Sequence, residues 1–533
     1  MRCILLIGFC IHIVGRAGSL SQTGGWGIVA PLRATDLPRL AAAITPDLSQ
    51  QAGTQPKRLR NRLTTRDNTM SLLRKKDVRQ MMAGVHGAGG LRKELSAFDL
   101  TMLGIGAIIG TGIFVLTGTG ATVAGPGLVL SFIIGAIACG FAALCYAEFA
   151  AMLPVSGSTY TYAYATLGEL VAWIIGWDLM LEYLLASSAV SVGWSGYFQS
   201  LIAGFGLHLP DALTAAAGAR PGVTTVFNLP AFVIAMLVTT LLAFGIKESK
   251  RVNNIVVLIK VAVVLVFIAV AVWHVKPANW HPALPFGMSG VFHGAAIVFF
   301  SFLGFDAVTC AAEEVKNPDR DIPRGVLWSL GICSVLYVVV SAIMTGIVPY
   351  MQFKGIDHPV SLALQVAKLD WFAGFVDLGA ILGMLTVILV MTYGQTRILF
   401  AMSRDGLLPK IFSDVHPKYG TPYKATWLIG TIIALIAGFV PLGTLAELVN
   451  IGTLAAFSLI AAAIIVLRKR EPNLPRKFHC PGVPYVPALA IVFCVFLMSQ
   501  LSWLTWVCFV VWLVIGLAVY FGYSRQHSLL HKP

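Results

Sequence analysis

The chain has 533 residues, of which 57% are hydrophobic and only 12% are charged, and its mean hydropathy is +0.80. Soluble domains carry about 25% charged residues, so this composition excludes an ordinary soluble protein. The apolar runs are about 20 residues long, the length that an α-helix needs to cross a bilayer, and they do not alternate as the strands of a membrane barrel do. We therefore expect an all-α polytopic membrane protein.

The formal net charge of +14 would suggest nucleic acid as a partner if the protein were soluble. The basic residues, however, lie in the N-terminal segment and in the loops between the apolar runs. The positive-inside rule explains this placement. We therefore expect the lipid bilayer, and no nucleic acid, as a partner.

Residues 1–90 differ in composition from the rest of the chain. Residues 3–14 are apolar but too short to span a membrane, and they could be the apolar part of a signal sequence. Residues 15–90 are rich in Gly, Pro, Arg and Gln, so we expect them to be mostly disordered. Because Met70 opens a basic segment that leads directly into the first strong span, we hypothesise that it is the true start and that residues 1–69 are upstream sequence.

Twelve apolar runs follow, and we predict each of them to be a transmembrane helix. They lie near 98–123, 127–152, 168–203, 229–246, 254–275, 290–313, 324–349, 372–403, 424–441, 443–468, 484–500 and 502–522. The third and eighth runs exceed the thickness of a bilayer, so we expect them to tilt or to project beyond it. The polar stretch 155–166 is expected to begin a helix on the cytoplasmic side.

Basic residues are concentrated in alternate loops. One set of segments contains Arg74, Lys75, Lys76, Arg92, Lys93, Lys247, Lys250, Arg251, Lys316, Arg320, Arg324, Arg404, Lys410, Lys418, Lys424, Arg468, Lys469, Arg470, Arg476 and Lys477. The opposite loops contain Arg220, Lys276, Lys354 and Lys368. The first set is therefore predicted to be cytoplasmic, with both termini inside and an even number of spans.

The first predicted span is rich in glycine, with Gly104, Gly106, Gly110 and Gly112 inside nine residues. Each glycine costs a helix about 1 kcal/mol relative to alanine, so this cluster lets the chain unwind. Unwound backbone is tolerated in a membrane where it lines a cavity or is buried in protein. The alternative is close helix packing through the GxxxG pattern, and this span alone leaves both open.

The sixth predicted span has a matching interruption at Ser301, Gly304 and Asp306. Since the first and sixth spans open two groups of five, the paired interruptions indicate an inverted-repeat transporter with its site near mid-membrane. The predicted domains are repeats at 98–275 and 290–468, which form a core at 98–470, and two additional helices at 484–522.

This pair of interruptions suits an α-amino acid, whose carboxylate and ammonium lie a short distance apart. Free N–H groups of residues 109–112 would bind the carboxylate, helped by the positive end of the outer half-helix. Free carbonyl groups near residues 300–303 would accept hydrogen bonds from the ammonium. We therefore predict a secondary active transporter for amino acids that works by alternating access.

Five motifs occur in order along the chain: IGAIIGTGIFVLTG, PVSGSTYTYAYATLGE, GWDLMLEY, FFSFLGFDAVTCAAEEVKNPDRDIPRG and GQTRILFAMSRDGLLP. They resemble those of the amino acid–polyamine–organocation (APC) superfamily, and particularly its bacterial cationic amino acid transporter-like branch. The resemblance covers about residues 70–525. It implies a leucine-transporter-type fold, five plus five inverted repeats with two extra helices, in the inner membrane of a bacterial cell. It implies no cofactor, with a proton gradient as the energy source.

The resemblance also implies roles for individual residues. The residues that would contact the substrate carboxylate are Ile109, Thr111 and Gly112. The residues that would contact its amine and side chain are Phe300, Ser301 and Leu303.

Lys260 lies inside an apolar part of the fifth span, about two turns from its inner end. A charge at mid-bilayer costs at least ~2.5–3.5 kcal/mol, so such residues are functional candidates. The alternative is that the amine snorkels to the cytoplasmic interface. In the branch that this chain resembles, a lysine stands where sodium-coupled members bind an ion, which implies that Lys260 exchanges protons and that uptake needs no sodium.

Several carboxylates also lie inside predicted spans. Asp178 and Glu182 share a face of the third span because they are four residues apart, and Glu182 either pairs with a neighbour or takes part in the proton route. Asp306 is expected to hold the unwound part of the sixth span by hydrogen bonds. Asp377 and Glu447 lie toward the outer ends of their spans and are assigned no catalytic role.

Met391 in the eighth span gives one indication of the substrate. Animal cationic members of the family have a small polar residue at this place, and a methionine makes a pocket shorter and more apolar. Alternatively, Met391 only packs against a neighbouring helix. We predict that neutral, small to medium amino acids are preferred over arginine and lysine.

Three other functions remain as alternatives. A cationic amino acid or polyamine exchanger with the same fold would differ only in coupling. A sensor that binds amino acids without moving them is disfavoured because little sequence lies outside the spans. A membrane enzyme is disfavoured because no HExxH, Walker or nucleophile-elbow motif stands in a suitable context. The sequence makes no prediction of oligomeric state.

Overall fold

The computed structural model describes residue 74 and residues 95–152, 158–220, 222–245, 250–310, 312–470, 472 and 476–529. The chain separates into two units, and the second, from Lys75 to Pro533, contains every element discussed below. The expectations for residues 1–90, namely disorder and a start at Met70, lie outside the described residues apart from Arg74.

Ten of the predicted runs are each formed by one helix. Their bounds are α6 Leu128–Met152, α8 Glu169–Ala203, α9 Leu229–Ala243, α10 Lys250–Ala271, α13 Pro318–Ile347, α15 Asp370–Arg404, α16 Tyr423–Phe439, α17 Leu442–Arg470, α18 Tyr485–Ser499 and α19 Trp503–Val519. The polar stretch before α8 forms α7 (Ser158–Thr166), as predicted, and α20 (Arg525–His527) follows α19. Between α13 and α15 lies α14 (Pro359–Val366), which was not predicted from the sequence.

The other two predicted runs are interrupted helices. The first is built from α4 (Ala97–Ile108), a π-helical turn (Gly112–Leu116) and α5 (Thr117–Ala124). The sixth is built from α11 (Gly287–Val298), a 3₁₀ turn (Phe299–Phe302) and α12 (Ala307–Cys310). The backbone turns extended at Ile109, with ψ of 99°, and at Leu303, with ψ of 144°. Both interruptions therefore occur where the sequence predicts them.

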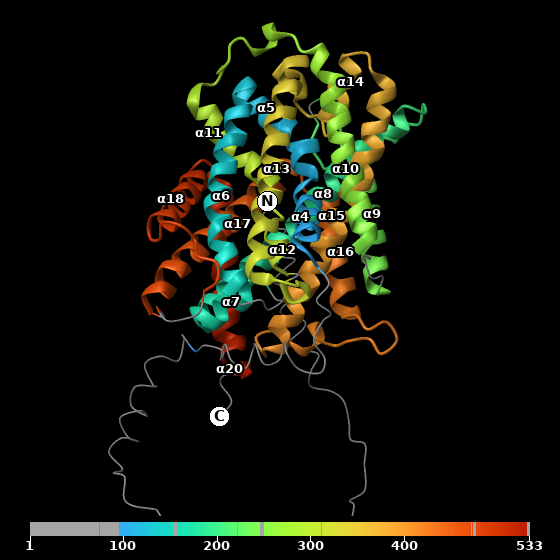
Figure 1. The fold of residues 1–533 in the computed structure, drawn as a ribbon. Coiled ribbons are helices and arrows are strands. Elements are labelled where there is room, and N and C mark those ends of the chain that lie inside the picture. Colours follow the sequence, from blue (N-terminus) through green and yellow to red (C-terminus); the bar gives the residue numbers. More distant parts are fainter. Residues whose placement is uncertain are drawn as a thin grey trace, which may run out of the picture. The chain divides into compact units, whose positions relative to one another are not determined.

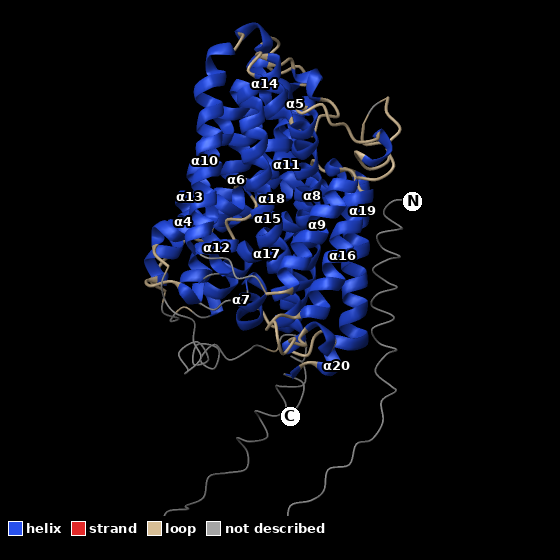
Figure 2. Ribbon diagram, turned by 90° about the vertical axis from the view of Figure 1, so that its right-hand side faces the viewer, coloured by secondary structure: helices blue, strands red, loops and turns tan. Residues whose placement is uncertain are grey.

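Figures 1 and 2 show the helices side by side in one bundle, joined by loops. α14 lies at one end of the bundle, while α7 and α20 lie at the opposite end. We call these the α14 end and the α7 end. Throughout the described residues, the one strand-type pairing is an isolated bridge between Leu95 and Val315.

α8 and α15 are the longest helices, with 35 residues each, and they pack along each other. Their close approach depends on small residues, since a Cβ on Gly394 of α15 would lie 2.6 Å from the ring of Tyr183 on α8. Large aromatic side chains such as Trp173 are fully buried on α8. A helix that is apolar around most of its surface belongs in the interior of a large bundle.

The outer surface of the bundle is apolar. Seven described helical stretches are long and apolar enough to cross a membrane, and five shorter apolar helices accompany them. Exposed leucine, isoleucine and valine side chains recur on several helices, among them Leu237, Ile255, Leu258, Val335, Val492 and Val510. Apolar surface of this extent is expected on a protein that faces lipid. The described chain is therefore an all-helical polytopic membrane protein.

Candidate functional site

The two interruptions lie directly against each other. Gly112 is so close to the 3₁₀ turn of the sixth run that a Cβ at this position would overlap the main chain of Ser301. A Cβ on Gly304 would lie 2.8 Å from the carbonyl carbon of Ala107. Gly304 also has a φ of +113°, a backbone conformation that residues other than glycine rarely adopt. Glycine is therefore required at both positions for the two segments to meet.

The first interruption leaves several main-chain N–H groups outside the helical hydrogen-bond ladder. The N–H of Ile109 still donates to the carbonyl of Ile105 at 2.8 Å, so this donor is used within α4. The next ladder bond runs from the N–H of Phe114 to the carbonyl of Gly110 at 3.3 Å. The N–H groups of Gly110, Thr111 and Gly112 precede that bond, in the place where a helix has unsatisfied donors.

Side chains from other helices cap the carbonyl groups at the ends of α4 and α11. The ammonium of Lys260 on α10 donates to the Gly106 carbonyl at 2.6 Å, and the hydroxyl of Tyr337 on α13 donates to the Ile108 carbonyl at 2.8 Å. On α11, the amide of Asn450 from α17 donates to the carbonyls of Ala296 at 2.7 Å and Ile297 at 3.0 Å. These bonds satisfy groups that would otherwise be unpaired in the membrane interior.

Lys260 is completely buried, and its side-chain carbons lie against Gly383 of α15. Its contact with the Gly106 carbonyl turns the ammonium toward the interrupted helix. The snorkelling alternative therefore does not describe the structure.

The second interruption is buried and contains an unpaired hydroxyl. Phe300, Ser301 and Leu303 are all buried, and the Oγ of Ser301 has no hydrogen-bond partner in the described part of the chain. The carbonyl groups here were expected to be free, but that of Phe300 accepts a hydrogen bond from the Leu303 N–H at 3.2 Å. A carbonyl oxygen retains a second lone pair for a ligand.

α15 forms another wall of the first interruption. The Oγ1 of Thr111 lies 3.6 Å from the sulfur of Met384, and a Cβ on Gly110 would lie 3.1 Å from Val387. Met391 is buried one turn beyond Val387 on the same face of α15. Met384 and Val387 were not predicted as site residues, although their helical spacing to Met391 is visible in the sequence.

Three carboxylates lie close together between α8 and the sixth interrupted helix. Glu182 is within electrostatic range of Asp178 and Asp306 and within hydrogen-bonding range of Thr453. The hydroxyl of Tyr183 donates to the Oδ2 of Asp306 at 3.2 Å. This side-chain hydrogen bond therefore ties Asp306 to α8, while its main-chain carbonyl accepts from the N–H of Thr309 at 2.8 Å at the start of α12.

A cavity of about 1190 Å³ opens at the α14 end. It is lined by the last turn of α8, by parts of residues 204–220 and by the start of α15. None of the site residues that the sequence predicts lines it. Among the described residues, no group of three or more His, Cys, Asp or Glu side chains could hold a metal ion.

Comparison with known proteins identifies the family. A sequence model described as "Amino acid permease" matches residues 95–528, which is most of the chain. The chain belongs to the amino acid permease family. This membership confirms the resemblance to the APC superfamily.

Individual relatives are similar over most of their length. The chain is 64% identical to the branched-chain amino acid permease BcaP of Bacillus subtilis, over 87% of this chain and 99% of the relative. It is 54% identical to the methylthioribose transporter of the same organism, over 87% of this chain and 100% of the relative. It is 39% identical to the vacuolar cationic amino acid transporter 4 of Arabidopsis thaliana, over 76% of this chain and 68% of the relative.

The permease thus combines several kinds of group where its interrupted helices meet. The first interruption supplies main-chain donors at residues 110–112, which suit an anion. The second supplies the unpaired hydroxyl of Ser301 and main-chain carbonyls. Apolar side chains from α15 complete the surroundings.

Proposed function

We propose that this permease is a secondary active transporter that takes up neutral amino acids together with protons by alternating access. The observation that carries the proposal is the contact between the two interrupted helices, because Gly112 and Gly304 each bring one opened stretch of main chain against the other. Opened backbone inside a membrane protein is typical of a midplane substrate site.

In this proposal the substrate carboxylate binds at Gly110, Thr111 and Gly112, near the positive end of the helix that continues into α5. It lies beside Ile109, whose own N–H is used within α4. The ammonium binds at the second interruption, to the Oγ of Ser301 and to main-chain carbonyls near Phe300 and Leu303. Met391 and the neighbouring apolar residues of α15 contact the substrate side chain. A zwitterion supplies a partner for both kinds of group at once.

We infer that the architecture has twelve transmembrane helices, made of two inverted five-helix repeats at 98–275 and 290–468 and two further helices at 484–522. The capping contacts support this repeat. Lys260 on the fifth predicted span caps the end of the first half-helix of span one, and Asn450 on the tenth caps the end of the first half-helix of span six. Equivalent contacts from equivalent helices are expected of an internal repeat.

The membrane placement is part of the same proposal. The α7 end is cytoplasmic, both termini lie on that side, and the protein resides in the inner membrane of a bacterial cell. The concentration of basic residues in the loops of this end supports the orientation. Named relatives from Bacillus subtilis support a bacterial setting.

Proton coupling is assigned to Lys260 and Glu182, without a cofactor. Lys260 is buried and contacts the first interruption directly, so its protonation would be sensitive to movement of α4. Glu182 lies beside Asp306 on the second interrupted helix. Ionisable groups buried in a membrane protein commonly mark proton relays.

The preferred substrates are proposed to be branched-chain amino acids, since the apolar α15 wall matches an apolar side chain and a branched-chain permease is among the relatives. Cationic amino acids and methylthioribose are the competing substrates that other relatives suggest.

The test is uptake of labelled leucine into proteoliposomes in sodium-free buffer with an inward proton gradient. We expect accumulation that collapses when the gradient is dissipated. Unlabelled valine and isoleucine should compete strongly, whereas arginine and methylthioribose should not. Arginine outcompeting valine would overturn the neutral preference, and gradient-independent exchange alone would overturn the proton coupling.

A further inference from the structure

The cavity at the α14 end is lined by a separate set of charged side chains. Asp211, Asp370 and Asp377 border it, together with Arg220 from the segment between α8 and α9. The cavity therefore offers both carboxylates and a guanidinium to whatever enters it. No part of the central site described above uses these groups.

Asp377 is a buried carboxylate in the lining of this cavity. It lies in the third turn of α15, is 2% exposed, and accepts a hydrogen bond at its Oδ2 from Ser200 of α8 at 2.8 Å. The hydroxyl of Ser361 also lies within hydrogen-bonding range of this carboxylate. Its Oδ1 is buried and has no hydrogen-bond partner in the described part of the chain. Leaving a buried carboxylate oxygen unpaired is unfavourable, so this atom calls for a donor from a ligand.

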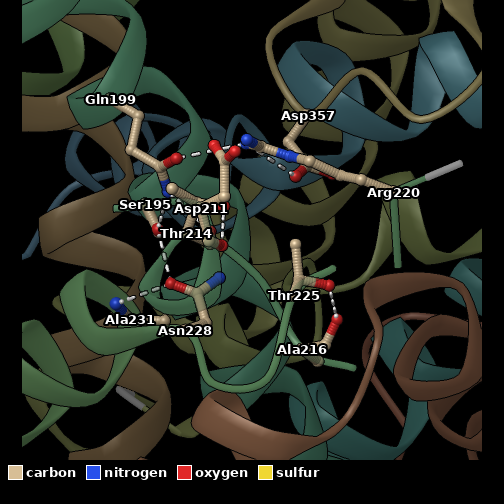
Figure 3. Close-up of polar contacts among 10 residues, drawn as sticks. All are labelled: Ser195, Gln199, Asp211, Thr214, Ala216, Arg220, Thr225, Asn228, Ala231 and Asp357. Atoms are coloured by element: carbon tan, nitrogen blue, oxygen red, sulfur yellow. Dashed lines mark hydrogen bonds and ion pairs between the residues drawn. The ribbon is translucent and has the colours of Figure 1, made fainter. Parts of the chain in front are cut away.

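Arg220, which lines the same cavity, has donor capacity to spare. One of its terminal nitrogens donates to the Oε1 of Gln199 at 3.1 Å and lies 3.9 Å from the Oδ2 of Asp357 (Figure 3). The second distance is too long for a hydrogen bond. Because a guanidinium has five N–H donors, it can bind an anion without losing the contact to Gln199.

The two groups are held at the same level of one helix. Asp377 is fixed by Ser200, and Arg220 is fixed by Gln199, the residue immediately before it in α8. Gln199 is itself held by the Oγ of Ser195 at 2.8 Å, as Figure 3 shows. Asp377 and Arg220 also line the same cavity, so one small molecule that carries both charges can meet both groups there.

We infer that this cavity is a second, outer binding site for an α-amino acid, in which Asp377 receives the ammonium and Arg220 receives the carboxylate. The inference rests on the proposed function, which makes the α14 end the entry side. An amino acid bound there stays at the α14 end of the permease until the central site opens toward this end.

Contacts link this outer site to the first interrupted helix. The hydroxyl of Tyr197 on α8 donates to the carbonyl of Phe114 in the π-helical turn at 2.5 Å, and its ring meets that of His358 edge to face at 6.5 Å. His358 directly follows Asp357, the neighbour of Arg220. A carboxylate that binds Arg220 therefore competes with Asp357 and loosens the segment that precedes α14.

The experiment is equilibrium binding of radiolabelled leucine to the purified full-length permease, up to millimolar concentration. We expect two leucine molecules per chain in the wild type. Asp377→Asn and Arg220→Gln should each bind only one, because each removes one of the two charges of the outer site. Asp370→Asn is the matched control, since Asp370 lines the same cavity but is exposed, and it should still bind two.

Three results would overturn or redirect the inference. One leucine per chain in the wild type would overturn it, and so would two per chain in both Asp377→Asn and Arg220→Gln. Each variant must elute from size-exclusion chromatography as a single species of wild-type size. If Asp377→Asn does not fold, Arg220→Gln still decides the test, because it changes a loop residue. No leucine binding by the wild type at all would instead contradict the proposed function.

Discussion

Lys260 and Asn450 cap corresponding ends of the two interrupted helices. Lys260 donates to the Gly106 carbonyl of α4 at 2.6 Å, and Asn450 donates to the Ala296 carbonyl of α11 at 2.7 Å. Lys260 lies on the fifth predicted span and caps the first, and Asn450 lies on the tenth and caps the sixth. Each cap therefore comes from the span four places later in the chain. The two caps differ chemically, because only the lysine can change its charge. We infer that the cap of the first interruption responds to protons, while the cap of the second does not.

Replacing Lys260 by methionine should abolish accumulation driven by a proton gradient. The methionine keeps most of the aliphatic stem against Gly383 but removes the ammonium, so the Gly106 carbonyl is left unpaired at a cost of about 1–3 kcal/mol. Leucine counterflow, which needs no net driving force, should persist. The exposed Lys276→Ala is the control and should transport normally. Normal gradient-driven accumulation in Lys260→Met would end the role of this residue in coupling.

Replacing Asn450 by leucine should lower both stability and transport. The variant loses two hydrogen bonds to α11 carbonyls, and each unpaired buried carbonyl costs on the order of 1–3 kcal/mol. Asn279→Leu is the matched control, since Asn279 donates to the carbonyls of Gly346 at 2.8 Å and Ile347 at 3.0 Å at the end of α13. We expect a lower Tm for both variants but reduced leucine uptake per folded molecule only for Asn450→Leu. Equal uptake by the two variants would make the cap purely structural.

Replacing Gly112 by alanine should reduce transport at least tenfold while the protein still reaches the membrane. The added methyl group would overlap the main chain of Ser301 and push the two interruptions apart, and overpacking of this kind typically costs about 1–3 kcal/mol. Gly331→Ala is the control, because no atom lies within 4 Å of a Cβ at that position of α13. Wild-type uptake by Gly112→Ala would show that the contact is not needed.

His358 should make the permease less stable in acid. Burial and the nearby Arg220 guanidinium lower the pKa of His358 from its ordinary value of 6.5 to about 4. Between these two values the unfolded chain takes up a proton that the folded chain does not, so the free energy of unfolding falls as pH falls from 6.5 to about 4. We expect Tm to drop less steeply over this range in His358→Gln than in the wild type. Parallel pH profiles would contradict the assignment.

Those features of the fold that depend on local composition were predictable from the sequence. α8 and α15 were predicted within about two residues because their apolar runs are uninterrupted and long. The two interruptions were predictable because clustered glycines and a polar residue stand inside apolar runs. Helix α14 was missed because it has only eight residues and lies in a segment too short and too polar to be recognised as a span.

Those features that depend on packing between distant segments were not predictable. Asn450 gives no sign in the sequence that it reaches α11, 153 residues away along the chain. Asp377 was assigned no catalytic role because it lies toward the outer end of its span, and its burial against Ser200 appears only in the structure. Likewise, the contact of Met384 with Thr111 follows from how α15 is turned in the bundle, which a single sequence does not specify.

The central claim is that the facing interruptions together bind the two charged ends of an amino acid. It is tested most directly by inhibition of leucine counterflow with two analogues, one lacking the amine (4-methylpentanoate) and one lacking the carboxylate (3-methylbutylamine). We predict that neither analogue inhibits at concentrations at which valine inhibits fully, because each leaves one interruption without its partner. Inhibition by either analogue as strong as that by valine would contradict it.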